Sequence, residues 1–466
     1  MEDTKTLHIA MFPWLAMGHL IPFFRLSELL AQKGHRISFI STPRNISCLP
    51  KIRSNLSTLI NLVSLPLPSR PDLPSDAEST MDVNNLQQQP LKHAFDQLRP
   101  ALVDFLESST PDWIIYDYAS HWLPQLAGEL GISRAYFSLF TAACLAFIGP
   151  RSDLAKDERS TPEDFTVAPK WVPFESNIYY RLHETTKFIE RIDEDKSGPS
   201  DLVRFAISVE QSDIVMIRSC EEFEQDWFDL LRKLLEKPVI PVGFLPPVTE
   251  SDVGEDDSNW VGIKQWLDKQ RSNSVVYVAF GTEPVLSRDE LTELALGLEK
   301  SELPFFWVLR NSPRSTQSTL EELPNGFTER VKGRGLVYNG WAPQVKVLSH
   351  DSVGGFLTHC GWNSVVEGLS FGRVLVLFPV TNDQGPNARL LEGKKLGVEI
   401  RRNERDGSFR SEWVAESLRL AMVDDPDKLL NRKTKEMMRC IQDKDRNEGY
   451  LGRLARYLEV ERRQVG

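Results

Sequence analysis

Short apolar segments of strand length alternate with amphipathic segments of helix length along the first half of this chain. Strands are expected at residues 7–12, 36–41, 113–116 and 135–138, with helices at residues 20–33 and 121–130. A strand that is followed by a helix and then by another strand builds a parallel sheet covered by helices. The alternation therefore predicts an α/β domain.

The second half of the chain repeats this alternation. Strands are expected at residues 274–280, 305–310, 335–338, 353–357 and 374–378, with helices at residues 288–299, 364–370 and 411–422. With 466 residues, the chain exceeds the roughly 250–300 residues at which a single hydrophobic core stops growing. Two α/β domains in series are therefore expected.

A solvated connector is expected at residues 246–258, where two prolines precede acidic and small residues. The expected domains are residues 1–245 and 259–466, with the last helix packing back on the N-terminal domain. Residues 65–86 and 150–173 are expected to form long loops of the first domain. Such loops either shape a ligand pocket or are surface insertions, and the sequence favours neither.

Composition excludes several classes of protein. The formal net charge of −11 argues against a general nucleic-acid binder, which needs basic surface to neutralise phosphates. A phosphate-bearing ligand must therefore be held by local groups. The five cysteines are far apart and form no CxxC pair, so neither a disulfide framework nor structural zinc is expected, and a reducing cytosol fits.

The first residues of the chain do not indicate export or membrane insertion. Residues 1–6 lack the basic start and the long apolar core of a signal peptide. The following run, residues 7–24, is interrupted by Pro13, Gly18 and Pro22, so it is not a transmembrane helix. A cytoplasmic protein without a membrane segment is expected.

The expected strand at residues 353–357 runs through residues 358–361 into a helix. Ligands of open parallel sheets bind beyond the carboxyl ends of the strands, and a helix N-terminus offers amide hydrogens and a positive dipole end. Gly361 lets the backbone approach a ligand closely. Further side-chain donors at this helix start are His359, Asn363 and Ser364. The segment therefore predicts a diphosphate site that needs no Walker-type lysine.

Residues on either side of this helix start allow two interpretations each. Ser364 and Glu367 fit the S-x-x-E capping box, which only begins a helix, although an exposed carboxylate at Glu367 also suits a vicinal diol. Trp341 is either a packed surface aromatic or a flat platform for a flat base. Asp383 and Gln384 offer a carboxylate and an amide, which can bond several sugar hydroxyls at once.

Taken together, the stretch from Trp341 to Gln384 resembles the signature box of the plant UDP-sugar-dependent glycosyltransferases. It opens on Trp-Ala-Pro-Gln, passes through His-Cys-Gly-Trp-Asn-Ser and Glu367, and closes on Asp-Gln. The resemblance implies two Rossmann-like domains that face each other across a cleft, the GT-B fold, and a UDP-sugar co-substrate. It implies no metal and no cofactor, and no Asp-x-Asp motif or His/carboxylate cluster occurs near the box. A monomer that takes a small-molecule acceptor is expected.

The resemblance also gives each matching residue a role in binding the UDP-sugar. Trp341 is expected to stack on uracil, and Ala342 and Gln344 are expected to help read the base. Glu367 is expected to hold the ribose hydroxyls. The remaining contacts are expected from Trp362, Asp383 and Gln384 around the sugar, from His359, Gly361, Asn363 and Ser364 at the helix start, and from the turn Gly281-Thr282 at the diphosphate.

Sugar transfer to an alcohol needs a base, and histidine suits this task because its ordinary pKa, ~6.5, lies near neutral pH. His19 is expected on a loop after the first strand, just before a helix, and Asp117 ends another strand of the same sheet. A carboxylate there can hold the imidazole and stabilise its cation. In the resembled family a Pro-x5-His loop carries the catalytic histidine, and His19 and Asp117 match the catalytic pair. Thr141 matches a position that reaches the transferred sugar, whereas His350 and the remaining histidines show no such pairing and are expected to be structural.

Three stretches, residues 12–19, 39–46 and 111–117, resemble a branch of this family that extends sugars already attached to flavonoids, terpenoids or steviol-type aglycones. The resemblance implies inverting transfer of glucose or rhamnose to the sugar of such a glycoside, and Trp362 with the terminal Gln384 favours glucose. Direct transfer to an aglycone and a non-catalytic nucleotide-sugar binder stay open as alternatives. A Rossmann-type oxidoreductase is disfavoured, because no GxGxxG follows the first strand.

Overall fold

The computed structural model describes residues 6–149, 159, 161–186, 198–248, 258–281, 286–310 and 319–461. The chain forms two compact units, each assembled from segments that are far apart in the sequence. The first unit consists of Met1–Glu158, Glu190–Leu245 and Lys444–Gly466. The second consists of Arg159–Ile189 and Pro246–Asp443.

A seven-stranded parallel sheet forms the centre of the first unit, in the order β3-β2-β1-β4-β5-β6-β7. Its strands are β1 His8–Phe12, β2 Arg36–Ser41, β3 Ile60–Ser64, β4 Trp113–Tyr116, β5 Ser133–Ser138, β6 Ile214–Ile217 and β7 Val239–Pro241. The four strands expected in this half are thus confirmed. The strand order reverses between β1 and β4, and the carboxyl ends of strands at such a point are where doubly wound sheets bind ligands.

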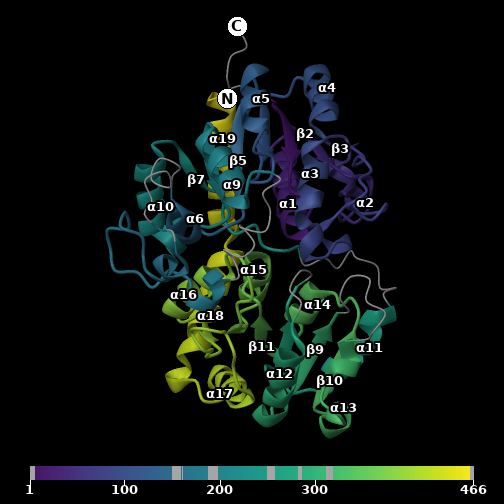
Figure 1. The fold of residues 1–466 in the computed structure, drawn as a ribbon, viewed down its shortest axis with the longest axis vertical. Helices are drawn as coiled ribbons and strands as arrows, with labels where there is room; N and C mark the ends of the chain where they lie inside the picture. The colour runs from purple at the N-terminus through teal and green to yellow at the C-terminus, as the bar shows by residue number, and fades with distance from the viewer. Residues whose placement is uncertain are drawn as a thin grey trace. The chain divides into compact units, whose positions relative to one another are not determined.

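Helices connect and cover these strands (Figure 1). They are α1 Met17–Gln32, α2 Pro43–Ser47, α3 Gln88–Asp96, α4 Arg99–Ser109, α5 Leu123–Glu129, α6 Ala142–Ile148, α9 Asp201–Glu210, α10 Glu221–Leu235 and α19 Lys444–Val460. β4 is buried along its whole length, as strands covered by helices on both faces are. The apolar side chains of α1 join the core through Leu20, Phe23 and Leu26.

The last helix, α19, packs on elements from the beginning and the middle of the chain. Trp113 Nε1 donates a hydrogen bond to the Leu458 carbonyl at 2.9 Å, and Tyr450 Oη donates one to Glu222 Oε2 at 2.7 Å. In Figure 1, α19 is the yellow helix among the purple and teal elements of the first unit. Removing the end of the chain would therefore open the core of the first unit.

The second unit contains a six-stranded parallel sheet in the order β10-β9-β8-β11-β12-β13. Its strands are β8 Val275–Ala279, β9 Phe305–Leu309, β10 Gly335–Asn339, β11 Val353–Thr358, β12 Val374–Leu377 and β13 Gly397–Glu399. All five strands expected in this half are confirmed. Its helices are α11 Ser258–Leu267, α12 Arg288–Ser301, α13 Phe327–Arg330, α14 Gln344–Ser349, α15 Trp362–Ser370, α16 Gln384–Gly393, α17 Ser411–Met422 and α18 Leu429–Gln442. Both units are thus α/β with Rossmann-like strand order, as the fold prediction requires.

Residues 161–186 belong to the second unit, although the sequence places them before the expected connector. Arg181 Nε donates a hydrogen bond to Glu399 Oε1 at 3.0 Å, and Glu184 forms a buried ion pair with Arg389 of α16. The expected first domain, residues 1–245, included this segment. The structure assigns the segment to the second unit, so this part of the domain prediction is wrong. Most of the expected connector, residues 249–257, lies outside the described residues.

In the part of the chain that the structure describes, no helix combines the length and the apolar character needed to cross a membrane.

Candidate functional site

His19 and Asp117 are in hydrogen-bonding contact in the first unit. β1 and β4 are neighbouring parallel strands, so the chain leaves the sheet at the same edge after Phe12 and after Tyr116. His19 Nδ1 lies 2.8 Å from Asp117 Oδ2. The Asp117 side chain is 2% exposed and that of His19 is 18% exposed. Because Nδ1 is bonded to the carboxylate, Nε2 is the nitrogen that can take a proton from another molecule.

His19 lies in the first turn of α1, and the prediction that it lies on the preceding loop is wrong. α1 begins at Met17, because the Ala16 carbonyl accepts hydrogen bonds from the backbone amides of His19 at 2.8 Å and Leu20 at 2.9 Å. The helix therefore fixes the backbone from which the imidazole projects.

The Asp117 carboxylate accepts three hydrogen bonds. Besides His19, the backbone amide of Trp14 donates to Oδ2 at 2.7 Å, and that of Ala119 donates to Oδ1 at 3.1 Å. The side chain is thus an acceptor only, and it ties the segment after β1, the end of β4 and the imidazole together. This arrangement orients one ring nitrogen of His19 toward the carboxylate.

Thr141 is a buried residue at the beginning of α6. It is the N-cap of that helix, and its Oγ1 accepts a hydrogen bond from the Cys144 amide at 3.2 Å. A threonine in this position stabilises the helix start. The sugar contact expected of Thr141 stays a prediction.

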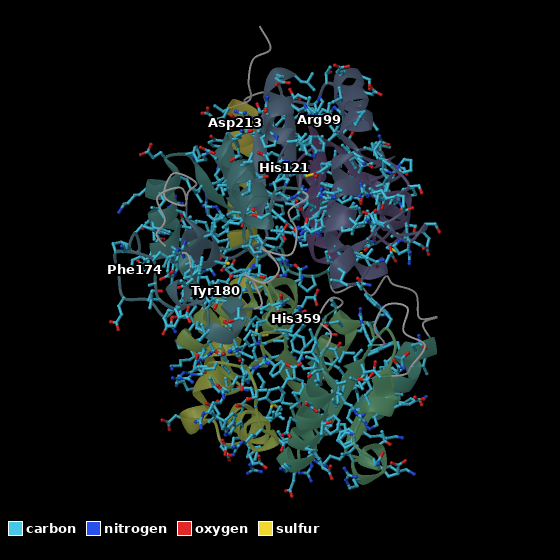
Figure 2. All side chains as sticks on the ribbon, in the orientation of Figure 1. Arg99, His121, Phe174, Tyr180, Asp213 and His359 are labelled. Carbon is cyan, nitrogen blue, oxygen red and sulfur yellow. The ribbon has the colours of Figure 1, made fainter. Side chains whose placement is uncertain are left out.

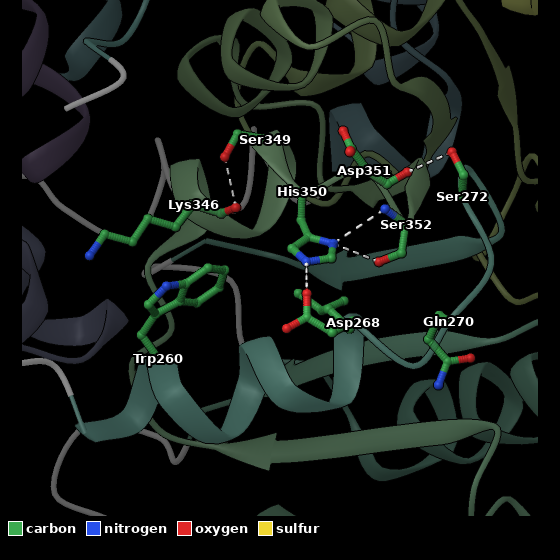
Figure 3. Close-up of a pocket in the computed structure, with 10 residues that line it drawn as sticks. Trp260, Asp268, Gln270, Ser272, Lys346, Ser349, His350, Asp351 and Ser352 are labelled. Carbon is green, nitrogen blue, oxygen red and sulfur yellow. Dashed lines mark hydrogen bonds and ion pairs between the residues drawn. The ribbon is translucent and has the colours of Figure 1, made fainter. Parts of the chain in front are cut away.

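The expectation that the other histidines have no carboxylate partner is wrong for His35, which lies 3.6 Å from Glu459 Oε1, for His121, which lies 3.9 Å from Asp96 Oδ1, and most clearly for His350. Its Nε2 lies 3.0 Å from Asp268 Oδ1, and its Nδ1 lies 2.8 Å from Ser352 Oγ. These residues line a hollow of about 490 Å³ together with Trp260 and Lys346 (Figure 3). Ser352 directly precedes β11, so this group lies at the amino edge of the sheet, opposite to the edge at which a diphosphate is expected.

His359, which Figure 2 labels, follows the carboxyl end of β11, and Gly361 lies where α15 begins. Cys360 between them has a positive φ of 67°, which turns the chain sharply from the strand into the helix. Gly361 is the N-cap of α15, and the structure gives it no capping side chain among the described residues. A helix N-terminus with a glycine cap is a place where backbone amides can bind an anion.

His359 lies against the glycines of this site. A Cβ atom added to Gly281, whose φ is +78°, would lie 2.9 Å from the ring, and one added to Gly361 would lie 2.4 Å from Nε2. Burial lowers the pKa of His359 to about 4, so the ring is neutral at pH 7 and can donate one hydrogen bond. Its Nδ1 atom is buried and has no partner among the described residues. Thr282, which was expected beside Gly281, lies outside the described residues.

Gln344 joins Ser364 and Glu367 in one hydrogen-bonded group. Its Nε2 donates to Glu367 Oε2 at 2.7 Å and to Ser364 Oγ at 3.1 Å. Its Oε1 lies 3.4 Å from the hydroxyl of the buried Tyr277. Because Gly361 is the N-cap, Ser364 is already inside α15, which excludes the capping-box interpretation of Ser364 and Glu367.

Trp341 is exposed at the same edge of the sheet, and its neighbour Ala342 is buried. The Trp341 side chain is 58% exposed, and it is the only aromatic among the exposed large apolar residues in the described ranges. The guanidinium carbon of Arg310 lies 4.7 Å from the centre of its ring. Sequence reasoning missed Arg310 and Tyr277, although Arg310 directly follows β9 and such positions at the carboxyl edge are where ligands bind.

Asp383 and Gln384 lie at the beginning of α16. The Gln384 Oε1 atom accepts hydrogen bonds from the backbone amides of Val380 and Thr381, both at 2.9 Å. The Gln384 amide therefore presents its NH2 group as a donor. Asp383 Oδ2 accepts a hydrogen bond from Asn387 at 2.8 Å. The residues of the sequence box thus gather at the carboxyl edge of β8, β10, β11 and β12, although Trp362 is almost fully buried.

No group of three or more His, Cys, Asp or Glu side chains that could hold a metal ion occurs in the described residues.

Comparison with known proteins gives consistent matches. A family model described as UDP-glucoronosyl and UDP-glucosyl transferase matches residues 248–423. UDP-glycosyltransferase 91C1 of Arabidopsis thaliana is 61% identical over 454 residues, which cover 97% of each chain. An anthocyanidin-3-O-glucoside rhamnosyltransferase of Petunia hybrida is 33% identical over 461 residues, which cover 97% of this chain and 96% of that protein.

A solved structure shows the same fold. The crystal structure of Arabidopsis thaliana UGT89C1 complexed with UDP-L-rhamnose has a TM-score of 0.76 to this chain at 26% identity. The match covers 98% of this chain and 100% of that one. The similarity therefore extends through both units.

Proposed function

This chain belongs to the plant UDP-glycosyltransferases, which transfer a sugar from a UDP-sugar to a plant metabolite, and we propose that His19 is its catalytic base and that Asp117 orients this base. The 2.8 Å contact between His19 Nδ1 and Asp117 Oδ2 carries the proposal. A histidine that is oriented by a buried carboxylate is the arrangement that general-base catalysis uses.

The proposed reaction is a direct displacement at the anomeric carbon. The acceptor hydroxyl gives its proton to His19 Nε2 while its oxygen forms a bond to the anomeric carbon. The bond between that carbon and the UDP oxygen breaks, and the electron pair leaves with UDP. One displacement inverts the configuration of the sugar carbon. The Asp117 carboxylate stabilises the imidazolium that forms.

The donor is proposed to bind to the second unit. The diphosphate would meet the N-terminus of α15, where Gly361 allows a close approach and His359 adds a neutral donor. Trp341 offers its exposed ring to uracil, and Glu367 offers a carboxylate to the ribose hydroxyls. Asp383 and the NH2 group of Gln384 would bond sugar hydroxyls.

Gly361→Ala should weaken UDP binding by roughly 10- to 100-fold, the loss expected when one or two charge-assisted hydrogen bonds are removed. The new Cβ atom would lie 2.4 Å from His359 Nε2, so the ring or the backbone has to move. Calorimetric titration with UDP measures the effect. Gly262→Ala is the control, because a Cβ atom there meets nothing within 4 Å. Unchanged affinity in Gly361→Ala would show that the diphosphate binds elsewhere.

The acceptor is proposed to be a glycoside, so that the product contains a sugar–sugar bond. The name of the Petunia relative specifies an anthocyanidin glucoside as acceptor, which supports this choice. The sequence stretches at residues 12–19, 39–46 and 111–117 support it independently. Transfer to a free aglycone is the competing outcome.

UDP-glucose should be used faster than UDP-rhamnose, and a flavonoid glucoside should be used faster than its aglycone. Gln384 at the end of the sequence box is the basis for glucose, whereas the names of the Petunia relative and of the complexed Arabidopsis structure favour rhamnose as the second candidate. The rate of UDP release, measured for both donors with both acceptors, tests the donor preference and the acceptor preference. Faster release from UDP-rhamnose would replace the donor assignment, and a preference for the aglycone would replace the acceptor assignment. A protein that binds UDP but releases none with any acceptor would be a non-catalytic binder.

A further inference from the structure

Arg310 contacts the face of the one exposed aromatic ring at the donor site. β9 and β10 are adjacent parallel strands, so Arg310, directly after β9, and Trp341, shortly after β10, leave the sheet at the same edge. The guanidinium carbon of Arg310 lies 4.7 Å from the centre of the Trp341 ring. This distance is within the range of a cation–π interaction.

Arg310 has an unusual electrostatic environment for an arginine. The side chain is half-buried, and no carboxylate among the described residues pairs with it. Burial lowers its pKa, and the neighbouring hydroxyl of Tyr277 acts in the opposite direction. Arginine stays protonated in proteins, so Arg310 is a cation. Among the described residues, its guanidinium lies against the aromatic ring of Trp341.

More than half of the Trp341 residue is exposed. The side chain is 58% exposed even though the guanidinium covers part of it. This exposure leaves room for a flat base against the ring, while Arg310 lies over one face of it. If Arg310 already restricts the rotation of the ring, less side-chain entropy is lost when a ligand stacks on it. The affinity for that ligand is then higher.

We propose that Arg310 is a positioning residue of the nucleoside subsite, which holds the Trp341 ring from one face so that uracil stacks on the other. This inference rests on the proposed donor site. Arg310 acts on the base through Trp341 and makes no contact with the diphosphate. The competing role for a cation at this edge is a direct bond to a phosphate oxygen, and the two roles predict different ligand dependence.

The test compares Arg310→Met, Trp341→Ala and the double variant with the wild type, using UDP, uridine and inorganic pyrophosphate as ligands. Arg310→Met keeps a long apolar side chain and removes the charge. It should weaken UDP and uridine by the same factor, roughly 3- to 30-fold, which is the range of a cation–π interaction. Pyrophosphate, which has no base, should bind as to the wild type. In the Trp341→Ala background, Arg310→Met should cause no further loss.

A loss of pyrophosphate affinity in Arg310→Met, or an effect that persists without Trp341, would overturn the proposal in favour of a direct phosphate contact. Equal uridine affinity in wild type and Arg310→Met would overturn it as well. Arg401→Met is the matched control. The guanidinium carbon of Arg401 lies 5.9 Å from the centre of the Trp413 ring, so this substitution removes a similar contact elsewhere in the same unit. Arg310→Lys, which keeps the charge, should recover part of the affinity if Arg310→Met is poorly folded. Absence of UDP binding in the wild type would instead contradict the proposed function.

Discussion

His19→Ala should lower kcat by roughly 100- to 10,000-fold, the contribution that general-base catalysis typically makes. The substitution removes the only group that we propose to take the acceptor proton. The residues that are proposed to hold UDP belong to the second unit, whereas His19 belongs to the first. The UDP dissociation constant should therefore stay within about twofold of the wild-type value, a difference well below 1 kcal/mol.

Steady-state UDP release and calorimetric UDP titration measure the two quantities on the same preparation. His121→Ala is the control, since His121 Nδ1 contacts Arg204 Nη1 at 3.1 Å and not Asp117. It removes an imidazole from the same unit and should leave kcat unchanged. Turnover of His19→Ala within tenfold of the wild type would exclude His19 as the base, because water alone does not replace a positioned base that well.

Much of the fold follows from local sequence, and the exceptions have physical reasons. β4, β8, β11 and β12 are nearly continuous apolar runs because both faces are covered, and their bounds agree with expectation to within a residue or two. β7 and β13 are three-residue strands at the edges of the sheets, too short to show a period. β3, also at an edge, is half-exposed. β6 is fully buried and apolar, so the same reasoning could have found it.

The candidate site also contains residues that the sequence predicts and contacts that it does not. Residues of the sequence box are recognisable because they are close together in sequence, and the pairing of His19 with Asp117 follows from the parallel order of β1 and β4. Contacts that depend on side-chain conformation were not predictable. One example is the hydrogen bond from Gln344 to Glu367. Another is the ion pair between Glu184 and Arg389, which attaches residues 161–186 to the second unit. No local sequence pattern connects the positions in either pair.

Asp117→Asn should lower kcat by roughly 100- to 1,000-fold with an intact donor site, because an oriented base and its carboxylate act as a unit. Asparagine has one acceptor oxygen in place of two, whereas Asp117 accepts from Trp14, His19 and Ala119. The amide oxygen is expected to face the Trp14 and His19 donors, which leaves its NH2 group against the Ala119 amide. The imidazole then keeps its partner but loses the negative charge that stabilises its cation.

The double variant His19→Ala/Asp117→Asn distinguishes this role from a structural one. If Asp117 acts through His19, the double variant should be no slower than His19→Ala alone. Asp117→Asn should also destabilise the fold by about 1–3 kcal/mol, since a buried donor loses its acceptor. Asp213→Asn is the matched control, because Asp213 accepts from the Arg134 amide at 2.8 Å and should affect stability without affecting kcat. Multiplicative losses in the double variant would mean that Asp117 contributes to turnover by a route that does not pass through His19.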